Sequence, residues 1–264
     1  MPLALEWSTA ETTERQQQAG LRFGDKGTHT SRTMMLSELT ELLEVVPADA
    51  TRPDHAAAII DENVLGKATT SNRRSTNQRL AELYGLDARL SLFRVLRRLW
   101  DADPDGRPLL ALLAALGRDP LLRYTAPTIL RLKPGSELVR TVLLEDLAHA
   151  TEGRLKESIR DKVARNAGSS WTQSGHLQGR VRKIRQTVEV TPGAVAFTLW
   201  LGSLQGLAGE GLLTSAWTAV LDSPPSRLLD LTLRAKQMGL VSARVGGGVI
   251  EIDATGLDPA KGGA

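Results

Sequence analysis

The chain has 264 residues, of which 41% are hydrophobic, 24% charged and only 4% aromatic. This composition is ordinary for a globular protein, and a core of Leu, Ala and Val favours helices. The sequence contains no cysteine, which excludes disulfide bonds, thiolate catalysis and cysteine-ligated metal sites. The net charge is +3, but its distribution along the chain is more informative than the sum.

Two arginine-rich segments hold most of the positive charge. Residues 71–100 contain seven arginines against two acidic residues, and residues 154–186 contain nine basic residues against two acidic ones. Arg matches phosphate geometry better than Lys does, so these segments indicate a polyanionic ligand. The plainer interpretation is that both are solvated helix faces.

The N-terminal sequence has no basic segment followed by a long apolar stretch, and no window approaches 18 consecutive apolar residues. We therefore expect a cytoplasmic protein with no signal peptide and no membrane partner.

The first third of the chain predicts an arm followed by three helices. Residues 1–33 are polar and weakly periodic, which indicates a flexible arm. Leucines at helical spacing predict a helix over 33–47, and a second helix follows over 53–66. A third helix, capped by Thr70 or Ser71, is expected to end before Gly85. This order, with arginines on the third helix, is typical of a helix-turn-helix unit.

The middle of the chain predicts only helices. Residues 91–100 are strongly amphipathic, residues 109–116 are almost wholly apolar, and Ser136 is expected to cap a helix that runs to Ala150. Residues 34–150 therefore form one predicted helical domain with a helix-turn-helix-like unit.

The remaining residues predict a second, winged-helix-like domain over 151–253. A basic helix over 158–167 precedes the extended basic segment 179–190, an order that resembles a recognition helix followed by a wing. Helices are expected over 194–207, 211–221 and 226–238. Apolar alternation around three glycines predicts a hairpin over 240–253, and residues 254–264 a disordered tail. The predicted fold class is mainly α, a helical bundle with winged-helix-like units and one or two short β-hairpins.

Catalytic and metal motifs are missing from the sequence. No histidine has a histidine partner at helical spacing, no GxSxG motif occurs, and the glycines 246–248 lack the lysine of a phosphate loop. The run 101–106 resembles a calcium loop, but Leu112 occupies the position of its required acid. We expect a protein that is not an enzyme and holds no metal or cofactor. A hydrolase with dispersed catalytic residues remains the alternative.

Nucleic-acid binding is the one function that the residue pattern favours. Arg, Lys and Asn are the side chains that contact phosphates and base edges. In a strand over 180–185, Arg180 and Arg182 would share one face, and Lys183 and Arg185 the other. The candidate nucleic-acid-binding residues are Asn72, Arg73, Arg74, Asn77, Arg79, Arg160, Arg165, Arg180, Arg182, Lys183 and Arg185.

The same residues resemble those of a known family. The run TSNRRSTNQRL at 70–80, the run SIRDKVARN at 158–166 and the tripeptide GHL at 175–177, before the basic tract, resemble the BrxA family of bacterial BREX phage-defence systems. The resemblance extends over residues 61–190. It implies a helical protein with winged-helix and NusB-like features that binds double-stranded DNA beside other defence-system subunits, without catalysis of its own.

Two alternatives remain open. The first is a protein-interaction adaptor, in which apolar helices such as 194–207 bind partner subunits and the basic faces are merely solvated. The second is an RNA-binding protein that uses the same arginines on a NusB-like helical body, although few aromatic residues are present to stack on single-stranded bases.

Overall fold

The computed structural model describes residues 5–246, 249–258 and 260. The prediction of a mainly helical bundle with short β-hairpins is confirmed. The α-helices of the described residues are α1 (Thr13–Gln18), α2 (Leu36–Val45), α3 (Arg52–Ile60), α4 (Thr70–Tyr84), α5 (Ser91–Ala102), α6 (Arg107–Arg118), α7 (Pro120–Arg123), α8 (Ala126–Leu130), α9 (Arg140–Ala150), α10 (Glu157–Gln173), α11 (Pro192–Leu204), α12 (Ala216–Ala219) and α13 (Pro225–Gln237).

Short 3-10 helices and two strand pairs complete the described structure. The 3-10 helices are η1 (Thr28–Thr30), η2 (Pro104–Gly106), η3 (Gly209–Thr214) and η4 (Thr255–Leu257). The strands are β1 (Leu177–Gln178), β2 (Ile184–Arg185), β3 (Ser242–Gly246) and β4 (Val249–Asp253). The two pairs, β1–β2 and β3–β4, are both antiparallel.

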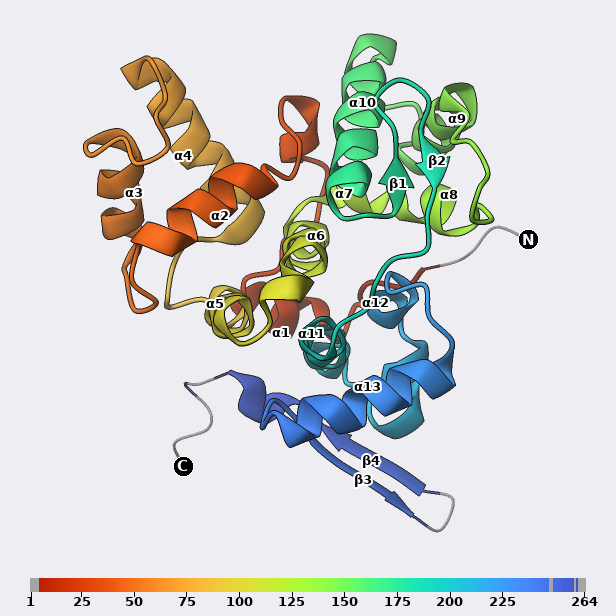
Figure 1. Cartoon of the computed structure of the whole chain (residues 1–264). Helices are drawn as coiled ribbons and strands as arrows, with labels where there is room; N and C mark the ends of the chain where they lie inside the picture. Colours follow the sequence, from red (N-terminus) through yellow and green to blue (C-terminus); the bar gives the residue numbers. More distant parts are fainter. Residues whose placement is uncertain (1–4, 247–248, 259, 261–264) are drawn as a thin grey trace.

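Two apolar helices, α6 and α11, form the centre of the molecule (Figure 1). Both are buried along most of their length, as expected for helices that are apolar on all sides. Helix α6 packs against α4, α5, α10 and α11, and α11 packs against α5, α6, α12 and α13. Helices α2–α5 therefore lie on one side of this centre, and α7–α10 with β1–β2 lie on another.

The helix ends of the predicted helix-turn-helix segment follow from local chemistry. Helix α3 begins with a capping box, in which the Thr51 hydroxyl accepts from the Asp54 backbone and Asp54 accepts from the Thr51 backbone. Helix α4 is capped by Thr69, one residue earlier than the sequence suggested. It ends at Tyr84 and is followed by the C-cap residue Gly85, whose φ of 84° few other residues adopt.

Both predicted hairpin regions contain antiparallel strands. Strands β3 and β4 pair Ser242 with Asp253 and Gly246 with Val249, while the turn residues 247–248 lie outside the described residues. Strand β2 also forms a bridge from Ile184 to Glu137, so it has a neighbour on each side.

That bridge explains why α9 starts later than expected. Ser136 was predicted to cap this helix, but the helix begins at Arg140. The Ser136 carbonyl accepts from the Arg185 backbone at 2.8 Å, and the Leu138 backbone donates to the Lys183 carbonyl at 2.8 Å. Residues 136–138 are therefore held extended beside the hairpin. The predicted helix 211–221 is likewise replaced by η3 and the short α12.

The N-terminal arm is packed rather than free over its described part. Leu21 is buried in the main hydrophobic cluster, and its neighbour Arg22 donates a backbone hydrogen bond to the Gly117 carbonyl at 2.9 Å. Gln16 and His29 are fully buried as well. Apart from α1 and η1, residues 5–33 follow an irregular path, which main-chain and side-chain hydrogen bonds hold in place.

The predicted domain boundary at 150/151 does not interrupt the packing. Leu143 and Leu147 of α9 form one cluster with Val163 and Ala164 of α10, across that boundary. The main cluster runs from Ala19 to Leu257. One continuous set of buried contacts therefore joins both predicted domains.

The predicted disordered tail is partly ordered. Leu257 and Asp258 are buried, and Arg94 of α5 donates to both Asp258 carboxylate oxygens at 2.7 and 2.8 Å. Residues 259 and 261–264 lie outside the described residues. Among the helices described, none has the length and apolarity that crossing a membrane requires.

Candidate nucleic-acid interface

The β1–β2 turn lies against one face of α10. A Cβ atom added to Gly168 of α10 would lie 3.4 Å from the Lys183 side chain, at ordinary contact distance, so the turn and the helix are neighbours here. Gly179 begins the turn with φ +110°, and a Cβ on it would lie 2.0 Å from the Arg182 carbonyl oxygen. The turn therefore depends on glycine at position 179, for its backbone conformation and for the close approach of the Arg182 carbonyl.

A pocket of about 240 Å³ lies between α9, α10 and this turn. We call it the basic pocket. Its basic lining residues come from three separate segments: Arg140 starts α9, Arg165 is on α10, and Arg180 and Lys183 are in the turn. No acidic side chain belongs to its lining, which otherwise consists of Leu138, Leu143, Ala164, Gly168, Ser169 and Val181.

The four cations of the basic pocket differ in their partners. Arg140 forms an ion pair with Asp161 of α10. In the part of the chain that the structure describes, neither Arg165 nor Arg180 forms an ion pair. The Lys183 ammonium donates to the Thr172 hydroxyl at 2.8 Å, which leaves one further donor besides its longer bond at the turn. The pocket therefore retains a positive surplus.

Lys183 is more buried than the three arginines of the basic pocket. Partial removal of its ammonium from water lowers the pKa of Lys183. An anion in the pocket would oppose that shift, because it stabilises the charged form.

The tip of the turn is exposed. The Val181 side chain is 95% exposed, and Arg182 beside it pairs with Glu137 while its own side chain stays 74% exposed. Arg160 lies on another face of α10, where it donates to the Leu155 carbonyl at 3.0 Å. Neither Arg160 nor Arg182 lines the basic pocket.

Arg185 is removed from the candidate set by its burial. Its side chain is fully buried and donates to the carbonyls of Ile129 and His176 and to the Asp222 carboxylate. The expectation of two outward strand faces over 180–185 does not apply, because only Ile184 and Arg185 are in strand β2 and residues 180–183 form the turn. Arg185 joins the hairpin to Asp222, three residues after α12, and has no surface for a phosphate to reach.

Two of the three arginines of α4, Arg73 and Arg79, bond to other groups of the same chain. Arg73 donates to the Lys67 carbonyl at 3.3 Å and to the Ile60 carbonyl at 3.2 Å, closing the loop between α3 and α4. Arg79 pairs with Glu82 at 2.7 Å. Asn77 has a buried side-chain oxygen without a hydrogen-bond partner in the described structure.

Of the predicted site residues on α4, Asn72 and Arg74, near its N-terminus, are exposed. The C-terminal half of the helix is buried through Leu80, Leu83 and Tyr84. Only part of the predicted nucleic-acid-binding set on α4 is therefore available to a ligand.

None of the predicted site residues of α4 lines the basic pocket, although Arg79 lines another pocket together with Arg154 of the second arginine-rich segment, beside Asp25 and Glu82. Helices α4 and α10 both contact η1, and Figure 1 shows them on either side of it. A larger hollow of about 620 Å³ is lined by the start of α2 and by Gln173 at the end of α10.

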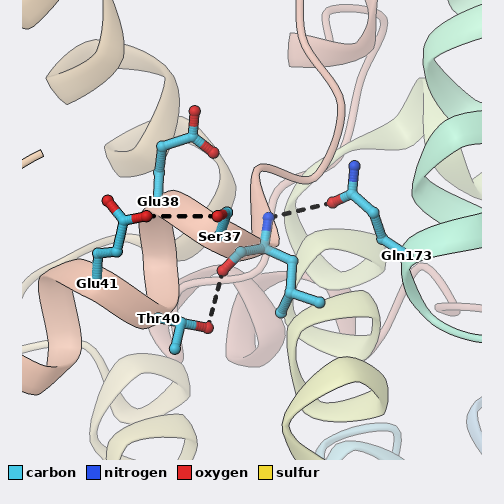
Figure 2. Close-up of a pocket in the computed structure, with 6 residues that line it drawn as sticks. Ser37, Glu38, Thr40, Glu41 and Gln173 are labelled. Carbon is cyan, nitrogen blue, oxygen red and sulfur yellow. Dashed lines mark hydrogen bonds between the residues drawn. The ribbon is translucent and has the colours of Figure 1, made fainter. Parts of the chain in front are cut away.

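That hollow is lined by two glutamates, and several of its lining residues form hydrogen bonds with one another. In Figure 2, the Ser37 hydroxyl bonds to Glu41, the Thr40 hydroxyl to the Leu36 carbonyl, and the Leu36 backbone to Gln173. Glu38 and Glu41 line it as well. Two carboxylates in one hollow disfavour a polyanion, so the basic pocket is the better candidate site.

Sequence reasoning missed Arg140 as a site residue. It is a single arginine among apolar residues, and it reaches the basic pocket only because residues 136–138 leave the predicted helix to pair with the hairpin. The sequence contained no local signal for this. Ser169 was missed too, although its spacing from Arg165 places both on one face of α10.

A triad-like network lies in the core. His29 Nδ1 is 2.7 Å from Asp119 Oδ2, and His29 Nε2 is 2.8 Å from Ser170 Oγ, an order that resembles a catalytic triad. The three residues are 0%, 1% and 0% exposed, and the Met34 backbone also donates to Ser170 at 2.8 Å. Burial acts to raise the pKa of Asp119, but the charge and hydrogen bonds of His29 hold it below its ordinary value. In this conformation the Ser170 hydroxyl has no surface for a substrate.

The comparisons with known proteins find nothing that assigns a function. No protein-family model matches the chain, and no curated protein gives a significant match. They neither support nor oppose the resemblance to the BrxA family. In the described parts of the chain, no three His, Asp or Glu side chains form a group that could hold a metal ion.

Proposed function

We propose that this chain binds duplex DNA without catalysis, through the basic pocket and the adjoining turn. The observation that carries the proposal is the convergence of Arg140, Arg165, Arg180 and Lys183 on one pocket without an acidic lining residue. These cations come from segments far apart in the sequence, and their mutual repulsion is relieved when a phosphate lies among them.

The chemistry of the pocket suits phosphate oxygens. Guanidinium groups donate paired hydrogen bonds to phosphates, and Ser169 adds a neutral donor from α10. Arg182 at the turn and Arg74 on α4 add exposed donors outside the pocket. Contacts of this kind position a duplex but carry no base sequence, so we expect binding that tolerates many sequences.

The resemblance to the BrxA family favours DNA as the nucleic acid and suggests where such binding takes place. A DNA-binding component of a bacterial phage-defence assembly would associate with other subunits of that system. RNA is the competing ligand, because the same cations contact its phosphates.

A protein-interaction adaptor is the second candidate, favoured by a different observation. Val245 and Val249, at the ends of β3 and β4, are 51% and 63% exposed, and exposed apolar side chains on a hairpin suit a protein partner. The helix expected to serve an adaptor, over 194–207, lies mostly in α11, which is buried within the chain and leaves no face for a partner.

The proposed function is tested by fluorescence anisotropy with a labelled duplex at low and at moderate salt. We expect salt-sensitive binding, weakened about tenfold by Arg165→Glu, because the substitution places a carboxylate in the basic pocket. Arg227→Glu on the exposed surface of α13 is the matched control. Competition with RNA of equal length compares the two nucleic acids. Absence of binding at low salt, or equal effects of the two substitutions, would reject the proposal.

A further inference from the structure

The charge of the basic pocket exceeds what one backbone phosphate requires. Asp161 neutralises Arg140, which leaves Arg165, Arg180 and Lys183 as a surplus of three positive charges around one small space. A phosphodiester within a strand carries a single negative charge. A phosphate monoester carries between about 1.5 and 2 negative charges at neutral pH. The surplus therefore favours the monoester.

The shape of the pocket also favours a phosphate monoester. A protein that follows a continuous backbone presents its cations along a stripe or an open groove. Here the cations surround a pocket of about 240 Å³ that is bounded by α9, by α10 and by the turn. A phosphate that projects from the end of a strand can enter such a space, whereas a diester held on both sides by its chain is less free to do so.

The remaining lining residues are suited to the atoms next to such a phosphate. Leu138, Leu143 and Val181 are aliphatic and contribute apolar surface beside the cations. Aliphatic side chains contact a sugar or a base edge without the selectivity of a hydrogen bond. Val181 is nearly fully exposed at the turn, where it can meet the terminal nucleotide.

We propose that the basic pocket binds the terminal phosphate monoester of a DNA strand. This inference rests on the proposed function and narrows it from the duplex surface to the end of the duplex. Arg165 and Arg180 contact the phosphate oxygens, and Lys183 adds its remaining donor.

The test compares hairpin duplexes that differ only at their single end. The ends carry a 5′-phosphate, a 3′-phosphate or hydroxyls alone, and the full chain is titrated with each by fluorescence anisotropy. We expect a phosphorylated end to bind at least about tenfold tighter than the hydroxyl end, since charge-assisted hydrogen bonds are added. Arg165→Gln and Arg180→Gln remove this preference, and Arg227→Gln retains it.

Each other outcome has a definite meaning. Equal affinity for phosphorylated and hydroxyl ends, with salt-sensitive binding retained, overturns the terminal-phosphate inference and leaves the proposed function standing. No binding to any duplex overturns both. Phosphoserine peptide and phosphatidate-containing vesicles form two further arms. Binding of either through Arg165 and Arg180, without preference for a phosphorylated DNA end, overturns the assignment to DNA.

Discussion

The two arginine-rich regions have similar compositions but different structural roles. On α4, Arg73 and Arg79 bond to carbonyls and to a glutamate of their own surroundings. At the β1–β2 turn and on α10, Arg180 and Arg165 line a pocket and form no ion pair within the described residues. The number of arginines in a segment therefore does not determine whether they are available to a ligand. Their availability depends on the hydrogen-bond acceptors that the fold places beside them.

The same contrast recurs inside the hairpin over a few residues. Arg180 and Arg182 are in the turn and exposed, whereas Arg185 is in β2 and fully buried. Successive side chains of a strand point to opposite faces, so one of two neighbouring residues can point into the core. An arginine at such a position needs hydrogen-bond acceptors inside the protein. Arg185 has them in Ile129, His176 and Asp222.

Arg185→Met has the largest expected effect on the stability of the hairpin region. It removes the bonds of the buried guanidinium to the Ile129 and His176 carbonyls and to the Asp222 carboxylate, and we expect the free energy of unfolding to fall by about 3 kcal/mol. Urea unfolding measures this, with Arg180→Met as the control in the turn. Equal losses in both variants would mean that the inward and outward arginines do not differ as the structure indicates.

His176, just before β1, gives the hairpin region a pH dependence. Burial lowers the pKa of His176 to about 3, while its unfolded pKa is about 6.5. His176 is neutral in both the folded and the unfolded protein above about pH 6.5, so its contribution to stability is complete there. Below that pH only the unfolded state gains the proton, and stability falls by about 1.4 kcal/mol per pH unit until the folded pKa is reached.

His176→Gln isolates that contribution from other titrating groups. We expect the loss of stability between about pH 7.5 and about pH 5 to be smaller in this variant by about 2 kcal/mol. Urea unfolding of the two proteins at both pH values gives the comparison. An identical pH dependence would show that His176 is not held neutral in the folded protein.

Arg73→Met tests the internal role of the α4 arginines. The substitution removes the donors to the Ile60 and Lys67 carbonyls, and we expect a loss of about 1–2 kcal/mol. Arg74→Met, one residue away on the exposed side, is expected to change stability by less than about 0.5 kcal/mol. Thermal unfolding of the two variants measures the difference. A larger loss of stability in Arg74→Met than in Arg73→Met would contradict the comparison.

Substitution of the exposed residues Asn72 and Arg74 of α4 has the smallest expected effect, a modest change in duplex affinity. Replacing Asn72 with Ala and Arg74 with Gln removes peripheral contacts only, so duplex affinity should weaken by no more than about fivefold. Anisotropy titrations at one salt concentration measure it. A larger loss than for Arg165→Glu would move the main binding surface from the basic pocket to α4.

Sequence reasoning succeeded where local chemistry decides the structure. The caps and periodicity of α4, the apolar run of α6 and the alternation around three glycines at β3–β4 each predicted an element that is present. The helix predicted from Ser136 begins only at Arg140, because β2, about fifty residues later, competes for its backbone. Pairing between distant segments is not visible in a local pattern.

The site was predictable only in part for the same reason. Arg165, Arg180 and Lys183 were identified by their basic segment, but Arg140 has no basic neighbours in the sequence. Likewise, the network of His29, Asp119 and Ser170 joins residues about 90 and 140 positions apart. Their geometry depends on three packed elements rather than on a motif.

The salt dependence of duplex binding tests most directly whether the basic pocket, rather than α4, holds the phosphates. The slope of log affinity against log salt should be measured for the unaltered chain, for Arg165→Gln with Arg180→Gln, and for Arg73→Gln with Arg79→Gln, with circular dichroism to verify folding. We predict that the pocket pair reduces the slope by about two and that the α4 pair leaves it unchanged. A reduced slope for the α4 pair alone, or for neither, would contradict the account.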